Sequence, residues 1–229
     1  MFRMFMVDSV RYWASEYDLD GFRFDLMGLH DLQTMQEIET AVHEVNPEAL
    51  IYGEGWTMGA TVEQRLAMNR LGAVILMISK GTPFWQAGEE MLRSKPDGKG
   101  GFDENSYSSS DEVNNIVWNA LAPNSDALRM MSYYQGLIAM RKEYEIFRGA
   151  EDVTITFTNL SGGAMSCLFE NGKGQKALVV LNPSETALTY ALDGTWNLVA
   201  DGTMAGTAVL AEESGSVTVD ACSAKVYVN

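Results

Sequence analysis

The sequence predicts an α/β protein in which parallel β-α units are followed by an all-β antiparallel sandwich. Two patterns carry this prediction: helix-like and strand-like segments alternate over residues 1–149, whereas residues 150–229 consist of short runs with alternating apolar residues. The chain has 229 residues, of which 46% are hydrophobic, so it is long and apolar enough to bury a substantial core. We therefore expect two domains, residues 1–149 and residues 150–229.

The N-terminal part alternates between helices and strands. Residues 2–17 carry apolar residues at helical spacing and predict an amphipathic helix, and residues 32–46 predict a second helix that ends before Pro47. The segments GFRFDLMG, from Gly21, and LIYGEGW, from Leu50, have the short, aromatic character of strands. This alternation is typical of parallel β-α units, whose functional groups lie at the carboxyl ends of the strands.

The middle of the chain adds two helices and a polar loop. A helix is expected from Thr61, with Gln64 three positions on as an approximate capping box, and it should close at Gly81. The segment GTPFWQAGEE that follows predicts a third strand with a loop. Residues 93–110 are rich in Lys, Gly, Asp, Asn and Ser, a composition typical of functional loops. A long helix with a broad apolar stripe is expected from Ser125.

Eight short runs predict the strands of the C-terminal sandwich: VTITFT, AMSCLF, KALVVLN, ALTYAL, WNLVA, TAVLA, SVTVD and AKVYVN. The two cysteines, Cys167 and Cys222, fall in this region and form no CxxC pair, so a zinc site has nothing to build on. We expect two buried thiols, and a disulfide between strands stays open because spacing cannot decide it.

The charge of the chain excludes two classes of partner. Sixteen Lys and Arg residues against 31 Asp and Glu residues give a formal charge of −15, which repels phosphate backbones and anionic lipids. We therefore expect no nucleic acid and no membrane as a partner, and residues 71–79, the longest uncharged apolar run, are too few for a membrane span. No signal peptide is visible, since Asp8 interrupts the N-terminal apolar stretch, which favours a cytoplasmic location. No DxDxDG-type loop is present, so we expect no metal.

Two carboxylates stand at the carboxyl ends of the first two predicted strands: Asp25 in GFRFDLMG and Glu54 in LIYGEGW. Neighbouring strand ends converge in a barrel-like sheet, and carboxylates about 5 to 5.5 Å apart serve retaining glycosidases as nucleophile and general acid/base. Arg23 shares the strand face of Asp25 and would hold that carboxylate ionised. A structural alternative stays open, in which Asp25 and Arg23 form an ion pair and Glu54 caps the following helix.

Four motifs in order carry a resemblance to a known family. GFRFDLMGLHD at residues 21–31, YGEGW around Glu54, GTPFWQAGEEMLRSK, and NSYSSSDEVNNIVW at residues 105–118 resemble motifs of type I pullulanases in the alpha-amylase clan of glycoside hydrolases. The match covers most of residues 1–149. It implies an α/β fold class, with a partial TIM (β/α) barrel over these residues that is followed by the all-β antiparallel sandwich over residues 150–229.

The resemblance also implies an activity. Type I pullulanases hydrolyse α-1,6 branch linkages in pullulan, glycogen or limit dextrin with retention of anomeric configuration. Asp25 would attack the anomeric carbon, Glu54 would protonate the leaving oxygen and later activate water, and Arg23 would orient Asp25. The implied partner is an α-glucan polysaccharide or oligosaccharide, and no cofactor is implied.

Further residues match motif positions near the family's cleft. Met27, His30 and Trp56, with Tyr107 in the later loop, could line sugar subsites, because flat or apolar surfaces suit the C–H face of a sugar. For His30, an ordinary hydrogen-bonded histidine near a helix start is an open alternative. Residues of the last motif strand and its loop could either brace the site or meet substrate: Glu89, Glu90, Asn105, Tyr107 and Asp111.

The resemblance is incomplete. Of the eight barrel strands of the family, only the fourth, fifth and eighth have counterparts, and the HDN motif that supplies the third catalytic carboxylate is missing. Because orientation and electrostatic preorganisation can each contribute several kcal/mol to catalysis, we expect little activity from this chain itself. Open strand edges would also favour self-association. Three hypotheses follow: a pullulanase-type hydrolase, a catalytically dead α-glucan-binding remnant, and a structural module.

Overall fold

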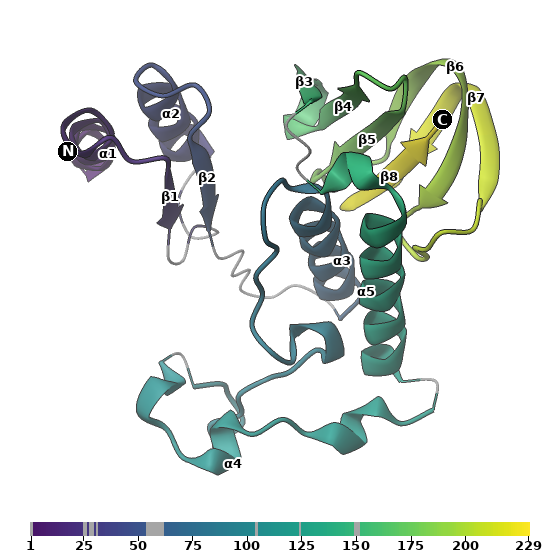
Figure 1. The fold of residues 1–229 in the computed structure, drawn as a ribbon. Coiled ribbons are helices and arrows are strands. Elements are labelled where there is room, and N and C mark those ends of the chain that lie inside the picture. Colours follow the sequence, from purple (N-terminus) through teal and green to yellow (C-terminus); the bar gives the residue numbers. More distant parts are fainter. Residues whose placement is uncertain are drawn as a thin grey trace. The chain divides into compact units, whose positions relative to one another are not determined.

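The computed structural model describes residues 2–24, 27, 30, 32–53, 62–103, 105–123, 125–148 and 152–229. The chain divides into two compact units, which we call the N-terminal unit (Met1–Ala60) and the C-terminal unit (Thr61–Asn229). Figure 1 shows their helices and strands, coloured along the chain. Within the described ranges, no helix is long and apolar enough to cross a membrane.

The N-terminal unit contains two helices and two strands: α1 (Phe2–Tyr17), β1 (Gly21–Phe24), α2 (Leu32–His43) and β2 (Leu50–Gly53). The strands pair in parallel, from Gly21 opposite Leu50 to Phe24 opposite Gly53. This pairing confirms the parallel arrangement that the alternation of helices and strands predicts. A Cβ atom at Gly21 would lie 2.5 Å from the carbonyl oxygen of Leu50, so the close approach of the two strands requires glycine.

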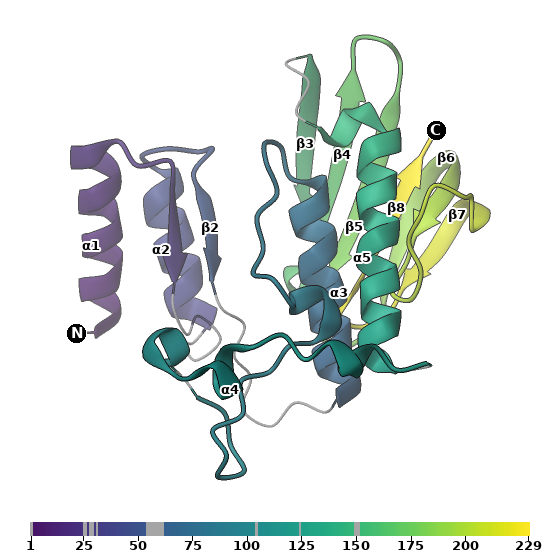
Figure 2. The same ribbon diagram turned by 60° about the horizontal axis from the view of Figure 1, so that its bottom comes forward.

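A small apolar core joins these four elements. Its five buried members are Val10 of α1, Phe24 of β1, Ile38 and Val42 of α2, and Ala49, which precedes β2. Ion pairs at the surface connect α1 to α2, with Arg3 3.2 Å from Glu37 and Arg11 2.6 Å from Glu44. The two helices therefore pack on each other as well as on the strands (Figures 1 and 2).

The C-terminal unit begins with helices and loops. Its helical elements before the sheet are α3 (Val62–Ile78), η2 (Glu89–Met91), η3 (Ser106–Ser108), α4 (Asp111–Asn114), η4 (Trp118–Leu121), α5 (Asp126–Glu143) and η5 (Glu145–Phe147). The predicted helix after Thr61 is α3, although it ends at Ile78, before Gly81. The hydroxyl of Ser125 accepts a hydrogen bond from the Leu128 N–H at 3.1 Å and caps α5, where a helix start is predicted.

The strand predicted in GTPFWQAGEE is not present, which corrects that prediction. Residues 81–88 form neither helix nor strand, and the described strands leave this segment without a ladder partner. Trp85 packs against the apolar core of the C-terminal unit instead. The backbone then turns at Gly88, whose N–H donates to the Glu90 carboxylate at 2.9 Å.

The rest of the C-terminal unit is an antiparallel sheet of six strands: β3 (Val153–Asn159), β4 (Met165–Asn171), β5 (Lys176–Asn182), β6 (Leu188–Ala200), β7 (Ala211–Val219) and β8 (Ser223–Val228). The order is β3-β4-β5-β8-β6-β7, and every neighbouring pair is antiparallel. The antiparallel all-β prediction is confirmed, but the strands form one hydrogen-bonded sheet rather than two separate ones.

The long strand β6 explains this difference. The runs ALTYAL and WNLVA, predicted as two strands, form this single strand, which pairs with β7 along most of its length but with β8 only from Asn197 to Ala200. Register shifts lie between Leu192 and Thr195 and again between Leu198 and Ala200. Bulges of this kind bend a strand and increase its twist. One sheet can therefore curl and enclose apolar residues on its inner face.

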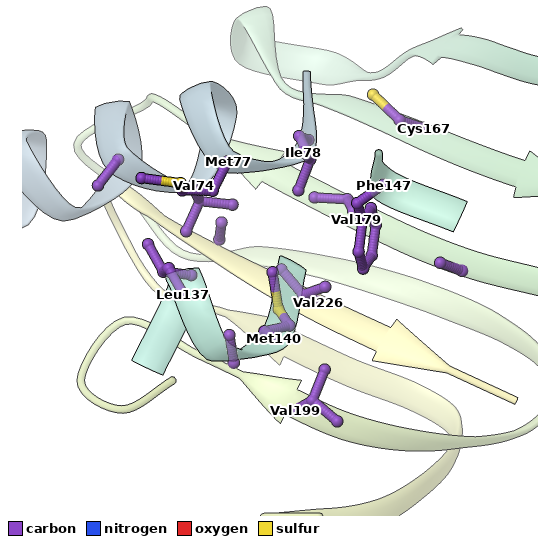
Figure 3. Packing of buried hydrophobic residues seen from close by; sticks show 14 of the residues in the cluster. Val74, Met77, Ile78, Leu137, Met140, Phe147, Cys167, Val179, Val199 and Val226 are labelled. Atoms are coloured by element: carbon purple, nitrogen blue, oxygen red, sulfur yellow. The ribbon is translucent and has the colours of Figure 1, made fainter. Parts of the chain in front are cut away.

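The sheet of the C-terminal unit buries both faces. One face meets α3 and α5, where Val74, Leu137 and Val179 are completely buried in one cluster (Figure 3). The other face buries a second cluster across β5 to β8, which includes Leu178 and Tyr227. This double burial explains why KALVVLN is apolar almost throughout. The helices α3 and α5 thus pack on the sheet in one compact unit, while the predicted domain boundary at residues 149/150 stays a prediction.

Both cysteines of the C-terminal unit are free thiols, Cys167 buried and Cys222 half-buried. Burial raises the pKa of the Cys167 thiol to about 11, and it also raises the pKa of Cys222. The expectation of two buried thiols is therefore confirmed for Cys167, whereas Cys222 is half-buried. Both thiols resist ionisation near neutral pH.

Candidate functional site

The two carboxylates predicted to do the chemistry, Asp25 and Glu54, lie outside the described residues, as does Trp56. The residues directly before the carboxylates are described: Phe24 and Gly53 end β1 and β2 and are paired with each other. Neighbouring strands in a sheet lie about 4.7 to 4.9 Å apart. The backbone that leads to the two carboxylates is therefore a pair of adjacent parallel strands ending side by side.

Arg23 lies within β1, opposite Tyr52 of β2. Its side chain is exposed, whereas that of Phe24 is buried in the core, so the two side chains leave the strand on opposite faces. Tyr52 is exposed as well and, as the register partner of Arg23, leaves the sheet on the same side. Sequence reasoning missed Tyr52, although it stands two residues before Glu54 in the motif that led to that carboxylate.

His30 and Met27 lie in the segment that follows β1. The His30 ring stacks on the Phe2 ring, with centroids 6.0 Å apart and planes inclined by 13°. The backbone N–H of His30 donates to the backbone carbonyl of Met27 at 3.1 Å, and the Met27 side chain packs against the core of the N-terminal unit. Both side chains are half-buried. His30 contacts Phe2 of α1, Met27 contacts the core, and each keeps part of its surface exposed.

Tyr107 lies in the C-terminal unit, within η3, and its side chain is 88% exposed. The residue before it is buried: the Ser106 hydroxyl accepts a hydrogen bond from Lys95 Nζ at 2.6 Å, and its carbonyl accepts one from Asn114 Nδ2 at 2.6 Å. The loop therefore holds the backbone at residue 106 firmly and presents the neighbouring tyrosine ring to solvent.

The same loop is braced by Asp103. Its carboxylate accepts hydrogen bonds from the Ser109 hydroxyl at 2.5 Å and from the Asn105 N–H at 3.1 Å. These bonds, the one from Ser109 first, lower the pKa of Asp103. Asn105 thus takes part in bracing the loop through its backbone, one of the two roles that the motif left open.

The two adjacent glutamates of the GEE motif have different surroundings. Glu90 accepts hydrogen bonds from Trp85 Nε1 at 3.4 Å and from the Gly88 N–H at 2.9 Å, so it braces the turn. Burial, to which the neighbouring Glu90 charge adds, raises the pKa of Glu89 even though a backbone hydrogen bond at Gln86 opposes the shift. Nearby, the Tyr134 hydroxyl donates to Asn69 Oδ1 at 3.1 Å. The hydrogen bonds from Trp85 and Gly88 give Glu90 a bracing role, one of the two roles that the motif left open.

Arg93 is a connecting residue that sequence reasoning missed. Its guanidinium donates to the carbonyl of Ala87 at 3.1 Å and to that of Asn114, which ties the segment after η2 to α4. Beside it lies a cavity of about 210 Å³ with largely apolar walls, which include Leu92, Val113 and Ile116. A single arginine in a polar stretch gives no signal of such a contact, because its acceptors are backbone carbonyls distant in sequence.

Among the described residues, no group of three or more His, Cys, Asp or Glu side chains is placed to hold a metal ion. What the described residues form is a pair of parallel strands with an exposed Arg23 and Tyr52, and a separate braced loop with an exposed Tyr107.

Comparisons with known proteins identify relatives of this arrangement. No protein-family model matches the chain. The pullulanase of Bacillus subtilis (strain 168) is 22% identical in the aligned part, which covers 65% of this chain and 33% of that protein. Among solved structures, a pullulanase from Bacillus acidopullulyticus matches with a TM-score of 0.62 and 23% identity, over 99% of this chain and 40% of that chain. The Group B Streptococcus pullulanase SAP in complex with maltotetraose matches with a TM-score of 0.62 and 19% identity, over 99% and 49%.

These similarities confirm the resemblance that the four motifs carry: the chain is related to debranching glycoside hydrolases. Its relatives include pullulanases and an isoamylase of Flavobacterium sp, and it shares the fold of the solved pullulanases over nearly its whole length. The chain spans about a third of the length of the Bacillus subtilis relative and less than half of the two structural relatives named above.

Proposed function

We propose that this chain carries the nucleophile and the general acid/base of a retaining glycoside hydrolase of the pullulanase type, which acts on α-1,6 linkages of α-glucans. The observation that carries the proposal is the parallel register of β1 and β2, in which Phe24 is paired with Gly53. Asp25 and Glu54 follow these two residues directly in the sequence. Carboxylates on adjacent strand ends suit the separation of about 5 to 5.5 Å that a retaining mechanism needs.

The proposed reaction has two displacements. Asp25 attacks the anomeric carbon while Glu54 gives its proton to the leaving glycosidic oxygen, so a covalent glycosyl-enzyme forms as the α-1,6 bond breaks. Glu54, now ionised, takes a proton from water, and the water oxygen displaces Asp25 from the anomeric carbon. Two inversions give net retention. Arg23 keeps Asp25 ionised and oriented through its positive charge.

In this proposal each unit has its own candidate residues for sugar contacts. Met27, His30 and Trp56 line subsites beside the carboxylates, and Tyr52 adds an exposed ring next to Arg23 on the same side of the sheet. Tyr107 offers an exposed ring on a braced loop, which lowers the entropic cost of holding it against a sugar. That a related pullulanase is described in complex with maltotetraose supports an α-glucan as the ligand.

A second candidate function is binding of α-glucan without turnover. The exposed tyrosine rings favour it, because they could hold sugar even where the third catalytic carboxylate of the family has no counterpart in the sequence. The two candidates differ in one measurable property, which is whether glycosidic bonds are broken.

The test compares release of reducing ends from pullulan by the purified chain with release by Asp25→Asn and Glu54→Gln. We expect slow release by the unsubstituted chain and a fall to background in both variants, because each substitution keeps the shape of the side chain and removes its acid-base or nucleophilic chemistry. Equal rates in all three proteins would overturn the proposal. Retained pullulan binding without any release would favour the second candidate.

A further inference from the structure

The two faces of the β1-β2 sheet present different side chains. Phe24 belongs to the core that α1 and α2 share with the strands, and Ile51 packs against that core. Arg23 and its register partner Tyr52 leave the sheet on the opposite face, as does Leu50 two residues before Tyr52. The alternation is clear in β2 and its surroundings, since Leu50 is 62% and Tyr52 51% exposed while Phe24 is 8% exposed. The fixed register therefore sets Arg23 beside Tyr52 on the face away from the helices.

The residues two places further along the chain are the proposed catalytic carboxylates. Side chains two residues apart in a strand point to the same face and lie about 6.6 Å apart along it. Asp25 follows Arg23 at this spacing, and Glu54 follows Tyr52. Both carboxylates lie outside the described residues, so the inference rests on the proposed function for their roles. Each carboxylate thus has a different neighbour before it on its own strand, a cation for Asp25 and a neutral aromatic ring for Glu54.

The charge of Arg23 does not by itself distinguish the two carboxylates. With neighbouring strands about 4.8 Å apart, the diagonal from the Arg23 position to the Glu54 position is about 8 Å, against about 6.6 Å to the Asp25 position. Coulomb energies at these two distances differ by only about a fifth. Arg23 therefore favours ionisation of both groups. A retaining mechanism requires a difference, because the general acid must keep its proton while the nucleophile is ionised.

The Tyr52 ring supplies this difference. Side chains in strands lean along the strand, so a ring as long as that of tyrosine reaches towards the side chain two residues away. An apolar ring against a carboxyl group excludes water, which disfavours the charged form and raises the pKa of the group. Glu54 would have this neighbour and Asp25 would not, because Arg23 holds the corresponding place on β1.

The other charges of the N-terminal unit act in the same direction or lie elsewhere. The negative charge of Asp25, one strand away, would also raise the pKa of Glu54. The charged side chains of α1 and α2, with the ion pairs that join them, belong to helices packed on the other face of the sheet. Asp20 and Glu48 precede the strands, at the end opposite the carboxylates. A protonated Glu54 must therefore be held mainly against the charge of Arg23.

We propose that Tyr52 is a positioning residue that keeps Glu54 protonated as the general acid, while Arg23 keeps Asp25 ionised as the nucleophile. The residue two places before each carboxylate then decides which of the two roles that carboxylate takes. Removal of the Tyr52 ring leaves Glu54 in water and within reach of the Arg23 charge, so Glu54 ionises at lower pH. A Tyr52 that only contacts sugar would instead change substrate binding and leave the pKa of Glu54 as it is.

Titration of the carboxyl group tests this without any turnover. The chain is labelled with 13C at the side-chain carboxyl carbon of glutamate, and the Glu54 signal is the one that disappears in Glu54→Gln. We expect the pKa of Glu54 to lie clearly above the ordinary value of about 4.3, to fall by about 1 in Tyr52→Ser, and to change little in Tyr52→Phe. A pKa at the ordinary value, or one that is the same in Tyr52→Ser, would overturn the proposal. An equal fall in Tyr52→Phe would also overturn it, since the ring is retained there.

Leu50→Ser is the matched control. Leu50 lies on the same strand and the same face as Tyr52 but four residues before Glu54, too far to cover it. Its truncation removes a similarly exposed apolar group and should leave the pKa of Glu54 nearly unchanged. Circular dichroism of each variant checks that the helices remain. A fall in Leu50→Ser as large as that in Tyr52→Ser would show a general loosening of the unit and contradict the role of Tyr52.

The pH dependence of hydrolysis gives a second readout. The basic limb of a bell-shaped kcat/KM profile reports the general acid, so Tyr52→Ser should move that limb to lower pH and leave the acidic limb in place. The two claims fail separately. A Glu54 pKa that depends on Tyr52, in a chain that releases no reducing ends from pullulan, would support the role of Tyr52 and contradict the proposed activity. Release of reducing ends with a Glu54 pKa that does not respond to Tyr52→Ser would contradict the role of Tyr52 alone.

Discussion

At the scale of single residues, Arg141 supports the end of α3 through hydrogen bonds to backbone carbonyl groups. Its buried guanidinium donates to the carbonyl oxygens of Met77 at 2.6 Å, Ser79 at 2.8 Å, Gly81 at 2.7 Å and Phe147 at 2.5 Å. The last carbonyl groups of a helix lack partners inside the helix, and a cation is favourable at that end. One side chain of α5 thereby fixes where α3 stops.

Replacing Arg141 with Met should lower the free energy of unfolding by about 2 to 3 kcal/mol, because several carbonyl groups lose a charged hydrogen-bond donor. Urea denaturation monitored by circular dichroism measures the loss. Lys142→Met is the matched control, since Lys142 is exposed on the same helix. An equal effect of the two substitutions would show that Arg141 does not hold the end of α3.

Glu213 is a second residue whose surroundings can be tested. Its carboxylate accepts hydrogen bonds from Lys225 Nζ at 2.8 and 2.9 Å and from the Tyr227 hydroxyl at 2.6 Å. Burial opposes ionisation, but the bonds from Lys225 and Tyr227 outweigh it and hold the pKa of Glu213 below its usual 4.5. The pKa is thus lower in the folded than in the unfolded state.

A lowered pKa makes a prediction with a definite sign. The ionised Glu213 contributes stability that is fully present above its unfolded pKa, near 4.5, and is lost as the pH falls through the folded value. Glu213→Gln should therefore reduce stability at pH 7 and flatten the fall in stability below pH 4.5. Denaturant unfolding between pH 3 and pH 7 measures this, with Glu212→Gln as the exposed control. An unchanged pH profile in Glu213→Gln would contradict the assignment.

At the scale of elements, α5 approaches the loop after β6 closely enough to require glycine. A Cβ atom at Gly136 would lie 1.9 Å from the Ala205 carbonyl oxygen, whereas one at Gly72 in α3 would meet nothing within 4 Å. The Tyr133 hydroxyl donates to the Asp201 carbonyl at 2.7 Å and fixes the same loop against α5. The two glycines, each inside a helix, form a natural pair for comparison.

Gly136→Ala should destabilise the C-terminal unit by about 1 to 3 kcal/mol, because the backbone must move to admit the methyl group. Gly72→Ala should instead stabilise it by up to about 1 kcal/mol, since alanine is the better helix former. Thermal unfolding of both variants measures the two opposite shifts. Stabilisation by Gly136→Ala would show that the helix and the loop do not approach as closely as described.

Sequence patterns predicted elements well where burial alternates or the apolar stripe is long. They indicated the parallel pair β1 and β2, the long helix α5 and the antiparallel strands of the C-terminal unit. They failed where the outcome depends on contacts distant in sequence: residues 81–88 found no ladder partner, and β6 became one bulged strand rather than two. Local pattern cannot supply either of these facts.

The candidate site shows the same division. The motifs located Asp25, Glu54 and Arg23 by position. The register of β1 and β2 pairs the residues that directly precede Asp25 and Glu54 with each other at the ends of the two strands. Tyr52 and Arg93 were missed because their significance comes from a register partner and from distant carbonyl groups. The sequence alone contains neither contact.

At the scale of the whole molecule, the two units differ in how completely they bury their apolar residues. The C-terminal unit packs α3 and α5 against one face of its sheet and closes the other face over a second cluster. The N-terminal unit, which contains the proposed catalytic residues, has a single small cluster of five buried apolar residues. We expect slow hydrolysis by the chain alone, because the HDN motif that supplies the third catalytic carboxylate in the family that the sequence resembles is missing.

The measurement that tests the central claim most directly is detection of a covalent glycosyl-enzyme. Glu54→Gln is mixed with α-maltosyl fluoride, whose fluoride leaves without needing a proton, so the first displacement proceeds while the second lacks its base. Mass spectrometry of proteolytic peptides should find one maltosyl group on the peptide that contains Asp25, and none when Asp25→Asn is added. A maltosyl group on any other residue, or turnover of the fluoride by the double variant at the rate of the unsubstituted chain, would contradict the assignment of Asp25 as nucleophile.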